Sequence, residues 1–556
     1  MAPGIAALAA RARTWWARAY RGPALDVAVS AGLALVTLAS RWPYRARMLY
    51  NWDAVQFALA LREFDIAKHQ PHPPGYVLYV GLGRLMNATL GDPTQAYVTL
   101  AMVFSAATTF IVYWLARALY DRVTATAAAA LLAVSPLFWF YGSVGLTYAG
   151  EAFGASLMAL LAYRTLAGSV AHLYLGALCL GLAGGFRPSV LVLLFPLWAI
   201  CAVRGVRVRA RLATAGAILA GAVLVWFLPL VWLSGGWTKY LRASAELYGS
   251  TVLPTSLLSG DLETSFRQAR YVLESVLVGL GPLAVALGAL PFYARRRGWA
   301  TREWFLVAWM APALAVYMLV HFGQAGYVLT FLPALVILLS GAVVELVTAG
   351  SERLRRPQWR WALTLAALGP LLLINTGFFV SARPVPREFD QRPAVDTWIE
   401  RARDEAHDWI LSRTAAALRE HEAVLRTYVE TIRAVYDGED TALLTELGNP
   451  RSYPWLRHAM FYLPEYPIYQ LYLRAEPPGF YAPQSSATMI LTPGTTITVP
   501  RRVRQLVWFV DHWDPAMPRP RGLLEIQLAY GRFLYVLPLG RHPVEHAGYT
   551  FVRDSE

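Results

Sequence analysis

Long apolar runs alternate with short polar loops over the first two thirds of the chain. A membrane-spanning helix needs about 20 predominantly apolar residues. About eleven stretches approach this length and composition, namely residues 25–38 (extended to about 42), 96–119, 123–140, 149–163, 172–185, 189–202, 212–233, 271–293, 304–320, 327–348 and 361–379. The pattern predicts a polytopic α-helical membrane protein with about 11 transmembrane helices.

Composition changes sharply near Val380. The 556 residues are 56% hydrophobic and only 15% charged, whereas soluble proteins carry roughly 25% charged residues. The deficit lies before Val380, and the remainder resembles an ordinary soluble domain. We therefore expect a transmembrane module at 1–380, including a long loop at 41–95, and a second domain at 381–556.

The distribution of arginine predicts an orientation. Basic residues concentrate in cytoplasmic loops of membrane proteins, so the basic N-terminus is placed in the cytoplasm. The stretch lacks a convincing cleavage site and leads into a retained first helix. Every second loop is then basic, and these loops carry Arg117 and Arg122; Arg164; Arg204, Arg207, Arg209 and Arg211; Arg295, Arg296, Arg297 and Arg302; and Arg353, Arg355, Arg356 and Arg360. This predicts residence in the cytoplasmic (inner) membrane with the C-terminal domain outside the cytoplasm. We attribute the net charge of +14 to these topology signals and expect no nucleic acid partner.

Two loops on the predicted outer side are long. The first, 41–95, contains the apolar stretch 76–86, which is too short to span and predicts an interfacial or re-entrant helix. The second covers about 234–270. After a Pro-rich link at 382–392, a charged helical pattern at 395–436 precedes short strand-like runs at 488–492, 495–499, 505–510, 523–529 and 533–537. We expect a small soluble α+β domain.

Polar residues at the outer ends of the predicted spans are candidates for function, because a charge within hydrocarbon is costly. The first loop contributes Asp53, the second Glu151, the third Arg187, and the fifth His321, Gln324 and Tyr327. Solvation is the simpler interpretation for Glu63, Asp65 and His69. An acid that removes a proton and a cation that receives a phosphate leaving group are what sugar transfer from a lipid phosphate needs.

The segment His72-Pro73-Pro74-Gly75-Tyr76 is the most distinctive local feature. Two prolines fix φ and remove donors, and Gly75 permits a sharp turn. The segment is either a loop that breaks into an interfacial helix or a rigid turn that presents His72 to an anion.

These residues carry a resemblance to the GT-C superfamily, whose members include protein O-mannosyltransferases and lipid A aminoarabinose transferases. An acid soon after the first membrane helix, followed about twenty residues later by a basic residue before Pro-Pro, is similar to that superfamily. Three stretches resemble a bacterial branch of O-mannosyltransferase-like proteins. They are Trp52-Asp53-Ala54-Val55-Gln56-Phe57, His72-Pro73-Pro74-Gly75-Tyr76-Val77-Leu78-Tyr79, and Ser135-Pro136-Leu137-Phe138-Trp139 with Glu151 downstream. The likeness covers about residues 25–200.

The resemblance implies roles for individual residues. Asp53 matches the acid that activates the acceptor, His72 the basic residue near the lipid phosphate or sugar, and Glu151 an acid that positions acceptor or sugar. The mannosyltransferases often have paired acids where Asp53 stands beside Trp52, so the acceptor type stays open. From position alone we add phosphate or sugar contacts by Arg187, His321, Gln324 and Tyr327, and positioning by Trp52 and Tyr76.

The predicted activity is an inverting glycosyltransferase that moves a hexose or pentose from a polyprenyl-phosphate lipid to an acceptor hydroxyl on a glycan, lipid or protein of the cell envelope, with Asp53 as general base. The lipid phosphate is the leaving group, so we expect no cofactor and no metal. The segment Asp511-His512-Trp513-Asp514 predicts a turn more than a metal site, and the small residues at 181–185 favour helix packing. Rival hypotheses are a polytopic transporter or lipid flippase, which predicts paired repeat halves with broken helices, and a non-catalytic scaffold.

Overall fold

The computed structural model describes residues 22–260, 262–382, 412–447, 449, 455–473, 490–491, 493–514, 516–540 and 542–554. The predicted link after 382 and the first part of the charged helical pattern, 395–411, lie outside these ranges, as does most of the strand-like run at 488–492. The remaining part of the pattern is helical.

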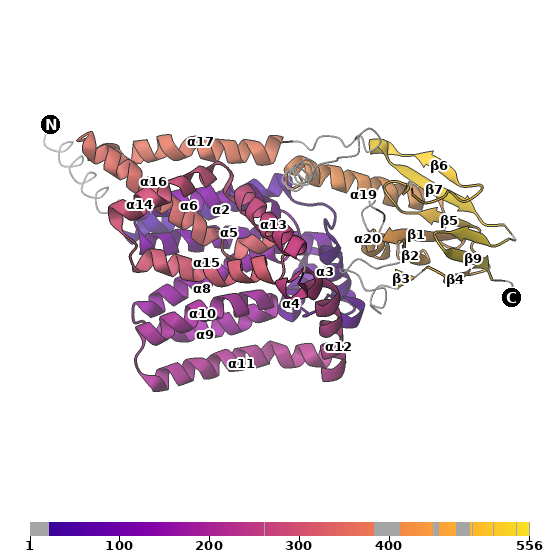
Figure 1. The fold of residues 1–556 in the computed structure, drawn as a ribbon, viewed down its shortest axis with the longest axis horizontal. Helices are drawn as coiled ribbons and strands as arrows, with labels where there is room; N and C mark the ends of the chain where they lie inside the picture. The colour runs from indigo at the N-terminus through magenta and orange to yellow at the C-terminus, as the bar shows by residue number, and fades with distance from the viewer. Residues whose placement is uncertain are drawn as a thin grey trace, which may run out of the picture.

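Long helices lie side by side in a bundle (Figure 1). Their bounds are α2 (Pro23–Arg41), α5 (Pro93–Leu119), α6 (Arg122–Ala133), α7 (Pro136–Tyr141), α8 (Tyr148–Leu166), α9 (Val170–Phe186), α10 (Pro188–Gly205), α11 (Arg209–Leu233), α13 (Leu262–Leu280), α14 (Leu290–Arg297), α15 (Thr301–Leu319), α16 (Leu332–Arg353) and α17 (Arg360–Ser381). Each predicted membrane segment coincides with one of these helices or with consecutive ones.

Seven helices in the described part of the chain are long and apolar enough to cross a membrane, by length and composition. They are Pro23–Tyr44, Pro93–Leu119, Pro188–Gly205, Arg209–Leu233, Ser265–Arg297, Leu332–Arg353 and Arg360–Ser381. The chain is an integral membrane protein. The figure of about 11 spans stays a prediction.

Local sequence sets where several helices begin. Proline occupies the first turn of α2, α5, α7 and α10, where its missing N–H costs nothing. Asp92 accepts a hydrogen bond from the Gln95 amide (2.7 Å) and Asp121 accepts one from the Thr124 amide (2.9 Å). These caps fix the starts of α5 and α6.

Glycines of α9 allow close packing against α11, as the sequence predicted. A Cβ at Gly181 would lie 2.5 Å from the Cβ of Ala222, and one at Gly185 would lie 2.7 Å from the ring of Trp226. The Trp226 indole N–H also donates to the Gly181 carbonyl at 2.7 Å. Small residues in this segment therefore position helices rather than bind a phosphate.

The two long loops are largely helical. The first contains η1 (Trp42–Tyr44), α3 (Trp52–Arg62), η2 (Ile66–Lys68) and α4 (Val77–Leu90). The short apolar stretch at 76–86 is thus confirmed as a helix, α4, whereas α3 was not anticipated. The second contains α12 (Trp237–Leu247), η3 (Tyr248–Val252), η4 (Leu253–Thr255) and η5 (Leu257–Ser259). Both loops lie at the bundle end that faces the C-terminal sheet (Figure 1).

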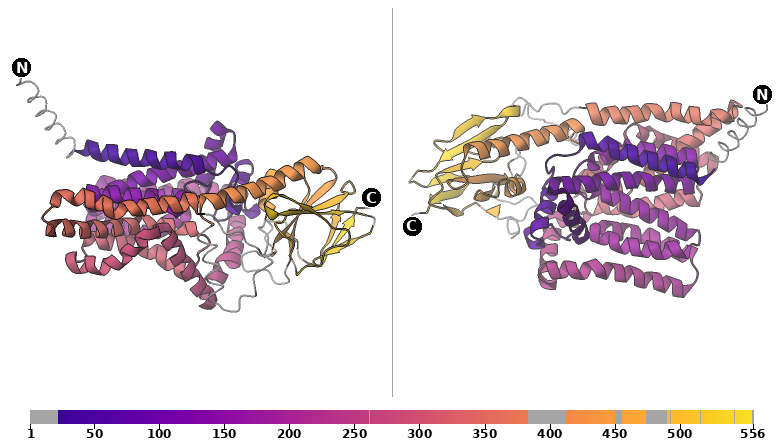
Figure 2. Two further views of the ribbon diagram at one scale, coloured as in Figure 1. Left: turned by 90° about the horizontal axis from the view of Figure 1, so that it is seen from above. Right: turned by 180° about the vertical axis from the view of Figure 1, so that it is seen from behind.

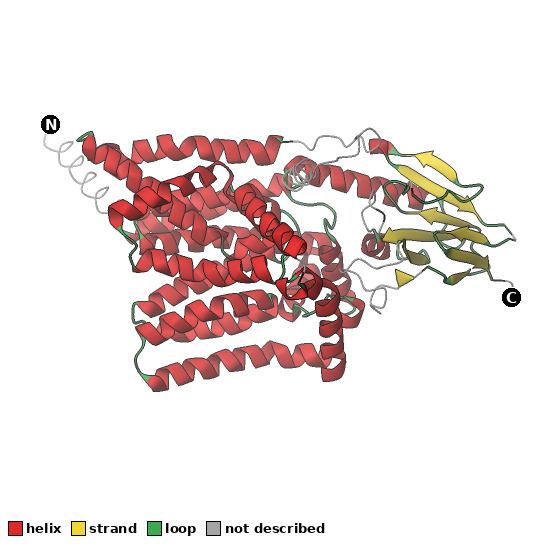
Figure 3. Cartoon of the chain, in the orientation of Figure 1, coloured by secondary structure: helices red, strands yellow, loops and turns green. Residues whose placement is uncertain are grey.

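The C-terminal part combines helices with strands, which gather at one end of the molecule (Figure 3). Its elements are α19 (Ala415–Val435), β1 (Thr441–Leu447), α20 (Leu456–Tyr462), β2 (Ile468–Tyr472), β3 (Ile490–Leu491), β4 (Thr496–Val499), β5 (Gln505–Trp508), β6 (Leu524–Gln527), β7 (Phe533–Pro538), β8 (Val544–His546) and β9 (Tyr549–Arg553). One sheet has the order β3-β2-β1-β5-β7-β6 and the other β4-β9-β8. Strand β1 pairs in parallel with β2 and β5, so α20 is a crossover between parallel strands, a feature absent from the sequence prediction.

This sheet domain contacts the first long loop directly. The Glu422 carboxylate of α19 accepts hydrogen bonds from the amides of Arg47 and Met48. The Leu49 amide donates to the Tyr462 hydroxyl at 2.8 Å, and the Leu49 carbonyl lies 3.0 Å from His458 Nε2. His458 lies within α20, and Tyr462 is the last residue of this helix. The two further views place the sheet beyond the same end of the bundle (Figure 2).

Acid is expected to weaken this contact. His421 of α19 also belongs to this contact, since its ring centroid lies 5.1 Å from that of Tyr50 in the first long loop. Burial lowers the pKa of His421 to about 4 and that of His458 to about 3, the latter aided by the nearby His421, from an ordinary value of 6.5. The folded state then binds fewer protons than the unfolded state below pH 6.5, so stability falls as pH decreases toward 4. The free energy of unfolding changes by up to about 1.4 kcal/mol per pH unit for each histidine.

Thermal unfolding of the purified chain between pH 7.5 and 4.5 measures this dependence. His421→Gln should flatten the dependence, whereas the exposed control His542→Gln should not; equal slopes in all three proteins would contradict the assignment.

Candidate functional site

Asp53 lies in the first turn of α3. The side chain of the preceding N-cap, Asn51, accepts a hydrogen bond from the Asp53 amide at 2.8 Å. The Asp53 Oδ2 atom accepts from Gln324 Nε2 at 2.9 Å, and its Oδ1 atom lies 3.7 Å from His72 Nδ1. The side chain is 26% exposed. One carboxylate oxygen is therefore held by a hydrogen bond, and the other lies beside His72 without one in the described part of the chain.

His72 is fixed by hydrogen bonds at both ring nitrogens. Nδ1 lies 2.6 Å from Gln56 Oε1 and Nε2 lies 3.1 Å from the Tyr76 hydroxyl. An amide oxygen only accepts, so Nδ1 carries the proton and Nε2 accepts from Tyr76. Burial lowers the pKa of His72, against the opposing charge of Asp53. This arrangement suits a neutral imidazole that orients its neighbours.

The Pro-Pro-Gly segment forms a tight turn before α4. Gly75 has φ +112° and Tyr76 has φ +47°, both in the left-handed region. A Cβ at Gly75 would lie 2.3 Å from a methyl carbon of Leu230. Glycine is thus required here by both backbone conformation and space, and the turn brings Tyr76 back to His72.

Glu151 and Arg187 form a buried ion pair between α8 and the start of α10. Glu151 Oε2 lies 2.6 Å from Arg187 Nε. The Oε1 atom accepts hydrogen bonds from the hydroxyls of Ser189, Thr330 and Tyr317 at 2.6, 2.8 and 3.4 Å. Arg187 Nη1 donates to Thr147 at 2.6 Å. A buried pair is tolerated only when its remaining polar atoms are also satisfied, and the three hydroxyls do so for Oε1, while Oε2 has the ion pair with Arg187.

Aromatic rings enclose the Arg187 guanidinium. Its central carbon lies 4.5 Å from the ring centroid of Tyr148 and 5.0 Å from that of Tyr327. Cation–π contacts of this kind stabilise a desolvated arginine. The cation is therefore held at one position with a defined orientation.

The short helix η7 (Ala325–Thr330) connects the Asp53 and Glu151 groups. Its N-cap, Gln324, donates to Asp53, and its last residue, Thr330, donates to Glu151. Tyr327 between them packs against Arg187. His321 instead faces the second long loop, where its Nδ1 lies 2.9 Å from the Thr255 hydroxyl, and burial lowers its pKa to about 4.

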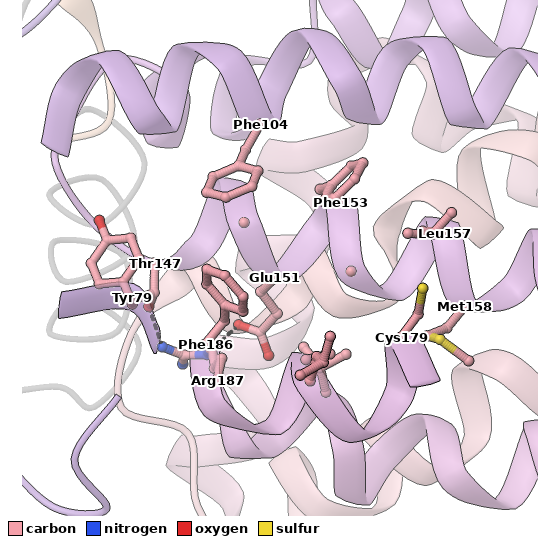
Figure 4. A pocket seen from close by; sticks show the side chains of 15 residues that line it. Tyr79, Phe104, Thr147, Glu151, Phe153, Leu157, Met158, Cys179, Phe186 and Arg187 are labelled. Carbon is pink, nitrogen blue, oxygen red and sulfur yellow. Dashed lines mark hydrogen bonds and ion pairs between the residues drawn. The ribbon is translucent and has the colours of Figure 1, made fainter. Parts of the chain in front are cut away.

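A pocket of about 170 Å³ lies between α5, α8, α9 and α10. Arg187, Glu151 and Thr147 form one end, and Phe153, Leu157 and Met158 lie toward the other (Figure 4). Its lining is otherwise almost wholly apolar, with Phe104, Phe186 and Cys179 among its walls. The shape suits a ligand with a charged head and an apolar tail.

The sheet domain adds arginines that sequence reasoning missed. Arg457 of α20 lies 5.5 Å from the Trp52 ring centroid and its Nη2 donates to the Lys68 carbonyl at 3.0 Å. Arg413, just before α19, lies 5.6 Å from the Phe140 ring centroid. Both arginines lie more than 300 residues after the motifs of the first long loop, so the sequence did not indicate this contact.

Most predicted site residues thus meet at one end of the bundle. Asp53, Gln324, His72 and Tyr76 form one connected group, and Glu151, Arg187 and Tyr327 a second. Trp52 faces Arg457, and His321 lies at the edge. Sequence reasoning also missed the hydroxyl and amide groups that hydrogen bond to these side chains, namely those of Gln56, Thr147, Ser189, Tyr317 and Thr330. Among them only Gln56 could have been found from its position, because it is a polar residue one turn after Asp53 on an otherwise apolar helix. Their roles stay predictions.

Asp511–Asp514 is irregular backbone after β5, with a bend at its first two residues. The Trp455 indole donates to Asp511 at 3.2 Å, and Asp514 accepts from the Ala516 amide at 3.0 Å. Within the described ranges, no group of three His, Cys, Asp or Glu side chains could hold a metal ion.

Replacing Arg457 with glutamine is expected to slow any activity that depends on Asp53, because Arg457 holds the loop on both sides of that residue through Trp52 and Lys68. A hydrogen bond from a charged group contributes about 1.5–3 kcal/mol, so we expect a fall of about tenfold or more. Steady-state turnover, compared with that of Arg433→Gln, an exposed arginine of the same domain paired with Glu465, measures the effect. Equal turnover in the two variants would contradict it.

Comparisons with known proteins agree with this geometry. Residues 57–209 match the model of the Protein O-mannosyl-transferase TMEM260 N-terminal domain. This range includes His72, Glu151 and Arg187, and begins just after Asp53. Comparison with curated protein sequences gives no match.

Solved structures establish the fold. ArnT from Cupriavidus metallidurans bound to undecaprenyl phosphate is 13% identical, with 92% of this chain and 97% of that chain covered and a TM-score of 0.55. The same enzyme in the apo state gives 13% identity, 94% and 98% coverage, and a TM-score of 0.53. The protein has the GT-C fold. The family match and this fold together support a glycosyltransferase.

Proposed function

We propose that the protein transfers a sugar from a polyprenyl-phosphate donor to an acceptor hydroxyl with inversion at the anomeric carbon. The observation that carries this proposal is the connection through η7 between a partly exposed acid, Asp53, and a fixed cation, Arg187, at one end of an apolar pocket. Sugar transfer needs a base near the acceptor and a positive charge near the leaving phosphate.

The donor is argued from the pocket. An apolar lining with one charged end accommodates a prenyl chain near its phosphate, and ArnT, a solved protein of similar fold, was crystallised bound to undecaprenyl phosphate. Arg187 carries a permanent charge, because a guanidinium does not lose its proton in proteins. His72, with its lowered pKa, acts in this proposal as a neutral group that lies beside Asp53 and is itself held by Gln56 and Tyr76.

The proposed reaction is a single displacement. The acceptor hydroxyl gives its proton to Asp53 while its oxygen forms a bond to the anomeric carbon. The bond from that carbon to the phosphate oxygen breaks on the opposite side, and its electron pair leaves with the lipid phosphate toward Arg187. Gln324 holds the second Asp53 oxygen, so the carboxylate keeps its orientation through the proton transfer.

The acceptor is proposed to approach Asp53 from the bundle end that carries the sheet domain. Contacts from Glu422, Tyr462 and His458 attach the domain to residues just before Asp53. With the arginine-rich loops taken as cytoplasmic, this end of the bundle faces away from the cytoplasm. We propose the cytoplasmic membrane as the location and a glycan, lipid or protein of the cell envelope as acceptor.

Transfer by the purified protein in liposomes tests the proposal. Radiolabelled polyprenyl-phosphate sugars and a crude cell-envelope fraction are added, and label in the acceptor fraction is measured together with the anomeric configuration of the product. The proposal expects label in the acceptor and inversion. Movement of donor across the bilayer without label transfer would instead support the lipid flippase, and donor binding without either process would support the scaffold.

A further inference from the structure

A second cavity lies at the bundle end opposite the sheet domain. It has a volume of about 270 Å³ and lies between the ends of α5, α6, α14, α15, α16 and α17. Its charged lining residues are Asp121, Arg297, Arg302, Glu345 and Arg360. In contrast to the apolar donor pocket, it is lined mainly by polar groups, and it lies where α17 begins and α14 ends (Figure 1).

Each arginine of this cavity is oriented by contacts with other side chains, and Arg302 also lies over the Tyr120 ring, 4.5 Å from its centroid. Arg297 Nε donates to Glu345 at 2.8 Å, and Arg302 Nε donates to Glu303 at 2.6 Å. Arg302 Nη2 also donates to the Tyr293 hydroxyl at 3.2 Å. Arg360 donates to Thr348 through Nε and pairs with Asp121 through Nη2. The guanidinium groups are therefore positioned before any ligand arrives.

Four guanidinium nitrogens are left without a protein partner among the described residues. They are Nη1 and Nη2 of Arg297, Nη1 of Arg302 and Nη1 of Arg360. The three side chains are 52%, 32% and 30% exposed, so they can be reached from outside. The planar guanidinium fork of arginine matches the oxygens of a phosphate and can bind two of them at once.

We propose that this cavity binds the phosphate group of an anionic membrane phospholipid. The neighbouring helix ends and the loop after α16 add Arg295, Arg353, Arg355 and Arg356 to the positive charge here, as well as Arg296, which pairs with Glu345 and Glu352. Basic pockets between membrane helices at the cytoplasmic face hold lipid headgroups, and this cavity joins the ends of helices that the sequence predicts to span. A bound phosphate would connect α14 and α15 to α17, and so stabilise the last helices of the bundle.

The site is independent of sugar transfer, because it lies at the other end of the bundle from Asp53 and Arg187. Free phosphate offers the same oxygens as a headgroup, so the experiment separates these two sources. The protein is placed in nanodiscs of phosphatidylcholine alone or of an equal mixture with phosphatidylglycerol, and inorganic phosphate is added to the first in a third sample. Thermal unfolding and the phospholipid retained in native mass spectrometry are both measured.

Wild-type protein is expected to gain about 2–4 °C in Tm with phosphatidylglycerol and to retain this lipid. Arg297→Gln should lose most of both effects, and Arg297→Lys should keep only part, because lysine lacks the fork. The control Arg209→Gln, an exposed arginine at the start of α11, should behave as wild type. Equal melting of wild-type protein in the two lipid compositions would overturn the proposal, even if Arg297→Gln fails to fold. An equal gain from inorganic phosphate alone would overturn the lipid as ligand.

Discussion

Asp53→Asn is expected to reduce sugar transfer by about 10²–10⁴-fold, the usual contribution of a general base. Asparagine fits the same space but cannot accept the hydroxyl proton. Asn51 still accepts from the amide of residue 53, and the substituted amide oxygen can still accept from Gln324. The fold and donor affinity should therefore stay close to wild type. Single-turnover transfer measures the chemical step, and binding of the lipid donor is followed separately.

Glu63→Gln is the matched control for this variant. Glu63 ends the same helix, is 56% exposed and pairs with Lys68 on the surface. An exposed pair contributes at most about 1 kcal/mol, so transfer should remain within a few-fold of wild type. Full transfer by folded Asp53→Asn would remove Asp53 as the base and leave the rest of the site to be reassigned.

Arg187→Gln is expected to impair both stability and transfer. It leaves the Glu151 carboxylate, whose side chain has no exposed area, without its counter-charge. Removing one partner of a buried ion pair costs about 3–5 kcal/mol. Loss of the charge that receives the leaving group should lower turnover by about 10²–10³-fold, by comparison with removal of one oxyanion donor. Thermal unfolding and transfer are measured on the same preparation.

The double variant Arg187→Gln, Glu151→Gln separates these two effects. Two neutral amides can hydrogen bond to each other and to Ser189 and Thr330, so most of the lost stability should return. Transfer should stay low, because the positive charge is still missing. Recovery of both properties would assign the pair a structural role only and would move the phosphate contact elsewhere.

Much of the helical part was predictable because each segment carries its own signal. A long apolar run is helical in a membrane wherever it packs, since its backbone groups must pair internally. The capping residues Asp92 and Asp121 and the prolines at first turns are equally local. The strands were harder: β1 was missed because all seven of its residues are buried, which removes the alternation that marks a half-exposed strand. The short antiparallel strands β8 and β9 were also missed.

By itself, the sequence determined the membrane module, the later soluble part, and the set of polar residues held at loop ends, because hydropathy and charge act residue by residue. Only the tertiary structure decided which of these residues meet. Gln324 reaches Asp53 across 271 positions, and Thr330 reaches Glu151 across 179. The hydrogen bonds that hold His72, the contacts of Arg457 with Trp52 and Lys68, and the arginine cavity at the opposite end likewise depend on distances between helices. Such distances follow from how the side chains of the whole bundle pack together, and no single segment encodes them.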